Sequence, residues 1–175
     1  METLKKALYA TVIVVVIAFG ASFLISPAFK VERSLEINAS PDKVFSYIVD
    51  LKQWKKWGVW YERDPKMQMT YSGPDNQVGM KSEWVSEKEG SGYMEITKVV
   101  PDTVLEYKLV FPDFDMQSQG KLVLEAKGDK TLVTWSDSGE VKGNPLNRIF
   151  ILFIDDMIGP DFEAGLINLR RVAED

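Results

Sequence analysis

Residues 31–45 read VERSLEINASPDKVF, and this stretch decides how the folded part of the chain begins. Its first seven residues alternate apolar and polar side chains, which is the period of a half-buried β-strand. Ser40 and Pro41 then supply an N-cap and a first helical residue, and apolar side chains follow at helical spacing. The stretch therefore predicts a strand over 31–37 that leads directly into a helix.

The segment after this helix predicts a second short helix and then a series of strands. Trp54 and Trp57 lie three residues apart on the short helix, and Gly58 ends it. Six further segments have strand-like patterns and are separated by turn residues: 67–71, 78–86, 92–100, 103–111, 117–127 and 131–140. Their close spacing predicts sequential antiparallel pairing in one sheet of about seven strands.

The C-terminal part returns to helical spacing. Asn144 and Pro145 open this helix, and apolar side chains recur on one face up to the end of the chain. Gly159 and Pro160 are expected to kink or break it. A curved sheet with one apolar face needs a cover, and this helix is available for it. We therefore expect an α+β fold, in which the sheet wraps around a long C-terminal helix and leaves a cavity between them.

The chain begins with an apolar segment of a different kind. Residues 7–29 carry no charge, and residues 8–25 are long enough to cross a membrane. Lys5 and Lys6 precede the segment, which predicts that the amino end stays in the cytoplasm. We expect residues 1–30 to be a single-pass anchor in the inner membrane. Residues 31–175 would then form one domain on the extracytoplasmic side.

Two other interpretations of this segment are open. The small residues Ala18, Gly20 and Ser22 at spacing two resemble the end of a cleaved signal peptide. Residues 23–25 continue the apolar run beyond them, which favours a retained anchor. The third interpretation is a buried helix of a soluble protein.

Composition excludes several kinds of chemistry. The chain has no cysteine and no histidine, so it forms no disulfide and has no Ser-His-Asp or Cys-His catalytic group. Its net charge is −5, and an acidic domain is not expected to bind nucleic acid. Asp155, Asp156, Asp161 and Glu163 are interpreted as a solvated helix face, because no loop converges oxygen ligands there. No metal or cofactor is expected, and the oligomeric state is left open.

Five short motifs together resemble a known family. They are ASPDKVF at 39–45, LxxWxxW at 51–57, GxGxMxI at 90–96, TxVTW at 131–135 and GLxxL at 165–169. On these motifs residues 31–173 resemble the START-like helix-grip superfamily (SRPBCC), and within it the polyketide cyclase/dehydrase and lipid-transport group. The resemblance implies two short helices after the first strand and a mostly apolar cavity under the last helix. It does not fix a function, because the superfamily includes carriers and enzymes.

The candidate residues for lining this cavity are aromatic side chains and methionines, which adapt to varied apolar partners. They are Trp57, Trp60, Tyr61, Met80, Trp84, Met94, Trp135, Phe150, Phe153 and Met157. Trp54 and Trp57 also fit a purely structural role, pinning the short helices to the sheet. The last three candidates are expected to face the sheet from the C-terminal helix.

The leading functional hypothesis is a membrane-tethered module that binds a hydrophobic small molecule or lipid. The first alternative is a cyclase/dehydrase-like enzyme that uses a cavity carboxylate or tyrosine on a carbonyl substrate. A cavity carboxylate with a raised pKa would favour this alternative, whereas the lack of histidine argues against it. The second alternative is an envelope interaction domain with a collapsed cavity.

Overall fold

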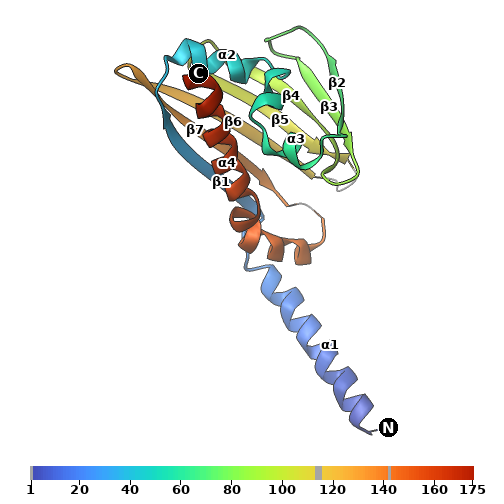
Figure 1. Ribbon diagram of the computed structural model, residues 1–175. Helices are drawn as coiled ribbons and strands as arrows, with labels where there is room; N and C mark the ends of the chain where they lie inside the picture. The colour runs from blue at the N-terminus through green and yellow to red at the C-terminus, as the bar shows by residue number, and fades with distance from the viewer. Residues whose placement is uncertain (1, 113–115, 142) are drawn as a thin grey trace.

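The computed structural model describes residues 2–112, 116–141 and 143–175 and consists of a domain with one separate helix (Figure 1). The separate helix is α1 (Glu2–Ser22). The domain contains, in chain order, β1 (Ala28–Ile37), α2 (Pro41–Val49), η1 (Gln53–Lys56), α3 (Val59–Arg63), β2 (Gln68–Ser72), β3 (Lys81–Ser86), β4 (Gly90–Val100), β5 (Val104–Phe111), β6 (Met116–Lys127), β7 (Lys130–Glu140), η3 (Pro145–Phe153) and α4 (Ile154–Glu174).

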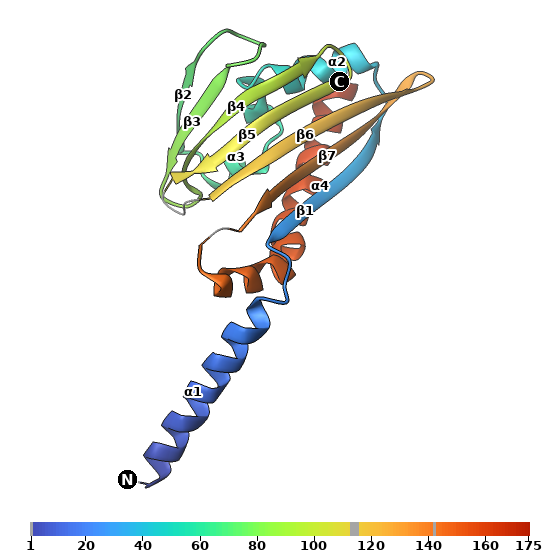
Figure 2. The same cartoon turned by 180° about the vertical axis from the view of Figure 1, so that it is seen from behind.

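The sheet has seven strands, and every neighbouring pair is antiparallel. Strands β2 to β7 pair in sequence order, and β1 pairs with β7 at the edge, from Ala28 opposite Glu140 to Ile37 opposite Thr131. Figure 2 shows the outer face of the curved sheet, with α4 behind it. The predicted α+β arrangement of a seven-stranded antiparallel sheet around a C-terminal helix is confirmed.

Three short helical segments, rather than the expected two, connect β1 to β2. Trp57 follows η1, and Gly58 separates it from α3, so Trp60 and Tyr61 lie within a helix. The indole Nε1 of Trp54 donates to the Ile48 carbonyl at 2.8 Å, and the Nε1 of Trp57 donates to the Tyr47 carbonyl at 3.1 Å. These bonds attach η1 to α2, which supports the structural role predicted for the two tryptophans.

Pro160 was expected to kink or break the last helix. The expected break is wrong, because α4 continues through this residue. The chain changes helix type earlier, between Phe153 and Ile154. Arg33 of β1 bridges the two sides of the proline: its Nη atoms donate to Asp155 at 2.8 and 2.9 Å, and its Nε donates to Glu163 at 2.7 Å. These bonds hold the turns before and after Pro160 against the sheet.

Helix α1 extends away from the domain, and most of its apolar side chains are exposed (Figure 1). Among the described residues it is the one helix whose length and composition suit a membrane crossing, with residues 5–22 as the apolar window. An N-terminal signal sequence meets the same criterion. The interpretation as a buried helix of a soluble protein is wrong, because the domain does not cover this segment.

Candidate functional site

A cavity of about 220 Å³ lies between the inner face of the sheet and the helices α3 and α4. Its lining is mainly aromatic, aliphatic and methionine side chains: Phe29, Trp54, Trp60, Tyr61, Met67, Trp84, Glu89, Met94, Tyr107, Leu109, Phe111, Met116, Ser118, Asp137, Ile154, Ile158 and Phe162. Sites for drug-sized ligands occupy about 300–1,000 Å³. The cavity as it stands therefore suits a small apolar molecule or a single hydrocarbon chain.

A cluster of tryptophans closes one side of the cavity. The rings of Trp135 and Phe162 stack with their centroids 4.2 Å apart and their planes 7° apart. Trp54, Trp57 and Trp60 each meet Trp135 edge-on, with centroids 5.3 to 5.9 Å away. Edge-on and stacked arrangements are the favoured geometries for aromatic pairs. The cluster is consequently a rigid wall against which a ligand can rest.

Strand register places two ionisable side chains next to each other on the inner face. Tyr107 of β5 pairs with Gly120 of β6, and Gly120 pairs with Asp137 of β7. A Cβ at Gly120 would overlap the ring and hydroxyl of Tyr107. The missing side chain therefore lets the tyrosine lie across β6 toward Asp137.

Asp137 is the buried carboxylate of the cavity, with 4% of its surface exposed. Burial raises its pKa from 3.8 to about 6, and the hydroxyl of Ser118, which donates to its Oδ2 at 3.1 Å, acts in the opposite direction. Burial also raises the pKa of Tyr107, whose hydroxyl accepts a hydrogen bond from the Trp135 Nε1 at 2.9 Å. Asp137 can thus exchange a proton near neutral pH, whereas Tyr107 stays protonated.

An ion-pair cluster fastens the rim of the cavity on the α3 side. The guanidinium of Arg63 contacts Glu89, which lines the cavity, at 3.1 Å and binds Asp161 of α4 through two nitrogens at 3.1 and 2.7 Å. Asp161 also accepts from the Trp60 Nε1 at 3.2 Å. Arg63 therefore links α3, the β3–β4 turn and α4.

The family model described as polyketide cyclase/dehydrase and lipid transport matches residues 28–174, which span the whole domain. The chain belongs to this family. Among curated protein sequences none matches it at a significant level.

Solved structures with the same helix-grip fold support this assignment at the level of fold. A Staphylococcus aureus protein of unknown function, SA2116, has a TM-score of 0.63 and 14% identity, with 84% of this chain and 95% of that chain covered. Norcoclaurine synthase from Thalictrum flavum, in complex with dopamine and hydroxybenzaldehyde, has a TM-score of 0.61 and 14% identity, with 85% and 88% covered. Aha1 from Colwellia psychrerythraea has a TM-score of 0.53 and 18% identity, with 77% and 91% covered.

The structure brings four of the ten predicted residues to the cavity of this polyketide cyclase/dehydrase and lipid-transport domain. Trp60, Tyr61, Trp84 and Met94 belong to its lining. Trp57, Met80 and Trp135 are buried in the core beside it, with at most 1% of their surface exposed, and lie outside the lining.

The expectation that Phe150, Phe153 and Met157 face the sheet is wrong. Their side chains are 65%, 54% and 67% exposed, respectively. Phe150 and Phe153 belong to η3, which lies below the sheet rather than against it (Figure 1). The residues of α4 that do line the cavity are Ile154, Ile158 and Phe162.

The sequence interpretation missed the polar members of the family cavity. Asp137 follows Val133 and Trp135 at spacing two on β7, and all three are buried on the same face. This alternation could have predicted a buried carboxylate, because it places Asp137 on the apolar face of the strand. The position of Tyr107 relative to Asp137 depends on the register of three strands and had no comparable local signal. The cavity also contradicts the alternative of a collapsed interior.

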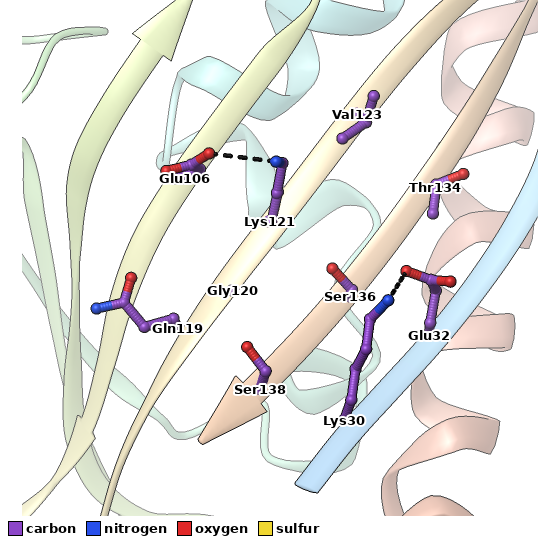
Figure 3. A pocket seen from close by; sticks show the side chains of 10 residues that line it. All are labelled: Lys30, Glu32, Glu106, Gln119, Gly120, Lys121, Val123, Thr134, Ser136 and Ser138. Carbon is purple, nitrogen blue, oxygen red and sulfur yellow. Dashed lines mark ion pairs between the residues drawn. The ribbon is translucent and has the colours of Figure 1, made fainter. Parts of the chain in front are cut away.

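A second, polar hollow of about 410 Å³ lies on the outer face of the sheet around Gly120 (Figure 3). The hydroxyls of Thr134, Ser136 and Ser138 form a row along β7. The charged groups beside them are paired with each other, Lys30 with Glu32 at 2.7 Å and Lys121 with Glu106 at 3.4 Å. This hollow is a solvated sheet surface and offers no unpaired charge for a ligand.

Proposed function

We propose that this protein binds a hydrophobic small molecule or a lipid hydrocarbon chain in the cavity between the sheet and α4, while α1 tethers it to the inner membrane. The observation that carries the proposal is the mainly apolar cavity bounded by the tryptophan cluster. Burial of apolar ligand surface would supply affinity at ~25 cal/mol per Å². Ser118, Tyr107 and Asp137 would orient one polar group of the ligand.

The proposed tether is supported by the length and apolar composition of α1 and by the two lysines in its first two turns. Lys5 and Lys6 favour a cytoplasmic amino end, and the domain would then lie on the extracytoplasmic side. A tethered domain meets membrane-dissolved ligands at a high effective concentration. The solved neighbour in complex with dopamine and hydroxybenzaldehyde indicates that this fold accommodates small aromatic molecules.

Native mass spectrometry of the full chain in detergent, with organic extraction of the same sample, tests this function. A reproducible co-purifying mass that is lost in Leu109→Trp, a substitution that fills the cavity, would support it. As a control, Ile167→Trp adds the same ring on the exposed surface of α4 and should keep the mass. A chain that stays without ligand after exposure to membrane lipid extract would contradict the proposal.

The raised pKa of Asp137 supports a second candidate, a cyclase/dehydrase-like enzyme. In its ionised form this carboxylate would remove a proton from the carbon next to a carbonyl group of the substrate, and in its protonated form it would return one. Solvent deuterium should then enter that position of a bound carbonyl compound in the wild type. Asp137→Asn should abolish the exchange but retain binding. Absence of exchange in the wild type would contradict the enzyme, and binding would be the remaining candidate function.

A further inference from the structure

Large apolar side chains are exposed at the end of the domain where α1 enters it. We define the basal patch as Phe23 and Leu24 after α1, Phe150, Leu152 and Phe153 of η3, and Met157 of α4. Their exposure ranges from 54% for Phe153 to 89% for Leu24. A concentration of exposed apolar surface of this kind marks a contact with a membrane or another molecule.

The basal patch and α1 form one continuous structure. Figure 1 shows η3 lying across the C-terminal end of α1. The guanidinium of Arg148 in η3 lies 5.8 Å from the ring centroid of Phe23 and donates to the Ile25 carbonyl at 3.5 Å. The position of η3 is therefore fixed relative to the end of the apolar helix.

The length of α1 places the patch at the boundary of any bilayer that this helix crosses. Glu2, Lys5 and Lys6 are charged, so the part of α1 that suits the hydrocarbon is residues 7–22, about 24 Å of helix. A hydrocarbon core about 30 Å thick therefore extends past Ser22. The patch begins at Phe23, the next residue. Apolar helices that lie in the membrane plane bury their apolar face at this depth.

We propose that the basal patch inserts into the interfacial region of the bilayer that α1 crosses, so that the cavity adjoins the membrane. This inference rests on the proposed tether. Asp155 and Asp156 lie beside the patch in the sequence, and Arg148 of η3 is directed at Phe23. The contact is therefore apolar and does not require anionic lipid.

The cavity wall and the basal patch are two faces of the same segment. Ile154 and Ile158 line the cavity, whereas Phe153 and Met157, each one residue earlier, belong to the patch. Phe29, near the start of β1, also lines the cavity and follows Leu24 by one short connection. Insertion of the patch would consequently bring the Ile154 and Ile158 side of the cavity close to the bilayer.

The absence of cysteine allows a direct test with single-cysteine variants of the full chain in phosphatidylcholine vesicles. Phe153→Cys and Leu152→Cys report on the patch when labelled with a polarity-sensitive fluorophore. Ile167→Cys is the matched control, because this side chain is half exposed on α4 well away from the patch. Val14→Cys, in the middle of α1, reports on the tether. Quenching is measured with lipids that carry a spin label near the headgroup or near the end of the acyl chain.

The expected result is strong quenching of the labels at 152 and 153 by the headgroup-proximal quencher, with no quenching at 167. Quenching should be the same at low and high salt, because the contact is apolar. The inference would be overturned if the label at 14 is quenched by the deep quencher but neither lipid quencher affects the labels at 152 and 153. That result would still support the tether. If those unquenched labels are nonetheless shielded from water, the patch contacts protein, which also overturns the inference. Absence of deep quenching at 14 would overturn the tether as well.

Discussion

The space between the sheet and α4 has two halves that use similar residues to opposite effect. In one half, Trp57 and Trp135 are almost completely buried and pack on each other, and Trp135 also stacks on Phe162. In the other half aromatic and methionine side chains line a cavity. We call these the filled half and the hollow half.

Both halves hold indole rings by hydrogen bonds, and they differ in how completely the space around the rings is filled. In the filled half the indole of Trp57 donates to the Tyr47 carbonyl, and the indole of Trp135 donates to the Tyr107 hydroxyl. In the hollow half the Trp60 Nε1 donates to Asp161, and Trp84 packs on its sheet neighbours, edge-on to Phe111 at 5.5 Å and over Gly92. We therefore expect the filled half to contribute most of the free energy of unfolding. The hollow half leaves space for a ligand.

Removal of an indole from the filled half should have the largest effect. Trp135→Ala should lower the free energy of unfolding by about 3–5 kcal/mol, because it leaves a large void in a dry core. Trp84→Ala should cost less, since its ring already borders a cavity. Urea unfolding of both variants in detergent, followed by the remaining tryptophan fluorescence, measures the two costs. Equal losses would break the distinction between the halves.

The carboxylate of the hollow half should reduce stability at neutral pH. Because the folded state raises the pKa of Asp137 from 3.8 to about 6, ionisation opposes folding. The stability that the protonated form provides is present at low pH and is lost as the pH rises through 6. Asp137→Asn should therefore be more stable than the wild type by up to about 3 kcal/mol near pH 8.

The same comparison below about pH 3 is its internal control, because the wild-type carboxyl is then protonated in both the folded and the unfolded state. Denaturant unfolding at a series of pH values gives the difference directly. A constant difference across this range would show that Asp137 titrates normally.

Two substitutions by tryptophan test whether the two halves differ in free space. Leu122→Trp adds a ring to the filled half and should cost about 1–3 kcal/mol by overpacking. Leu109→Trp adds the same ring to the hollow half, where the cavity accommodates it at lower cost. Thermal unfolding of the two variants in the same detergent compares them. A cost for Leu109→Trp that matches Leu122→Trp would mean that the cavity cannot accept an added group.

The smallest effect on stability is expected at the rim. Arg63→Gln removes the charge that links Glu89 and Asp161, and partly exposed ion pairs contribute little to the free energy of unfolding. Its main result should be faster ligand release, because fewer contacts then hold α3 to α4. Dissociation rates at low and high salt test this, and a rate that equals the wild type at low salt would contradict it.

Much of the fold was predictable because its signals are local. The alternation in β7 and the Ser40-Pro41 helix start each depend on a few neighbouring residues. The path of the last helix was harder to predict. The residues that hold the turns around Pro160 include Arg33, which is far away in the sequence. The break expected at Pro160 from the helix sequence alone is therefore not present.

The candidate site was predictable only in part, for a related reason. Trp60 and Trp84 could be proposed as lining residues from residue type, but Phe153 looked equally suitable and is exposed. Its exposure follows from the change of helix type at Ile154, which turns η3 away from the sheet. To predict that Tyr107 and Asp137 lie close together, one would need the register of β5, β6 and β7. Such long-range pairing has no short sequence signature.

The pairing of β1 with β7 has a consequence for the order in which the protein folds. Synthesis completes β1 first among the strands and its partner β7 last, so β1 has an unpaired edge while the rest of the sheet is made. Strands β2 to β7 can form successive hairpins in the meantime, because each neighbours the next in the chain. Closure of the edge then needs a long-range pairing, and pairings of this kind slow folding. A variant that slows this step would leave unpaired strand edges open to aggregation before it changed the stability of the finished domain.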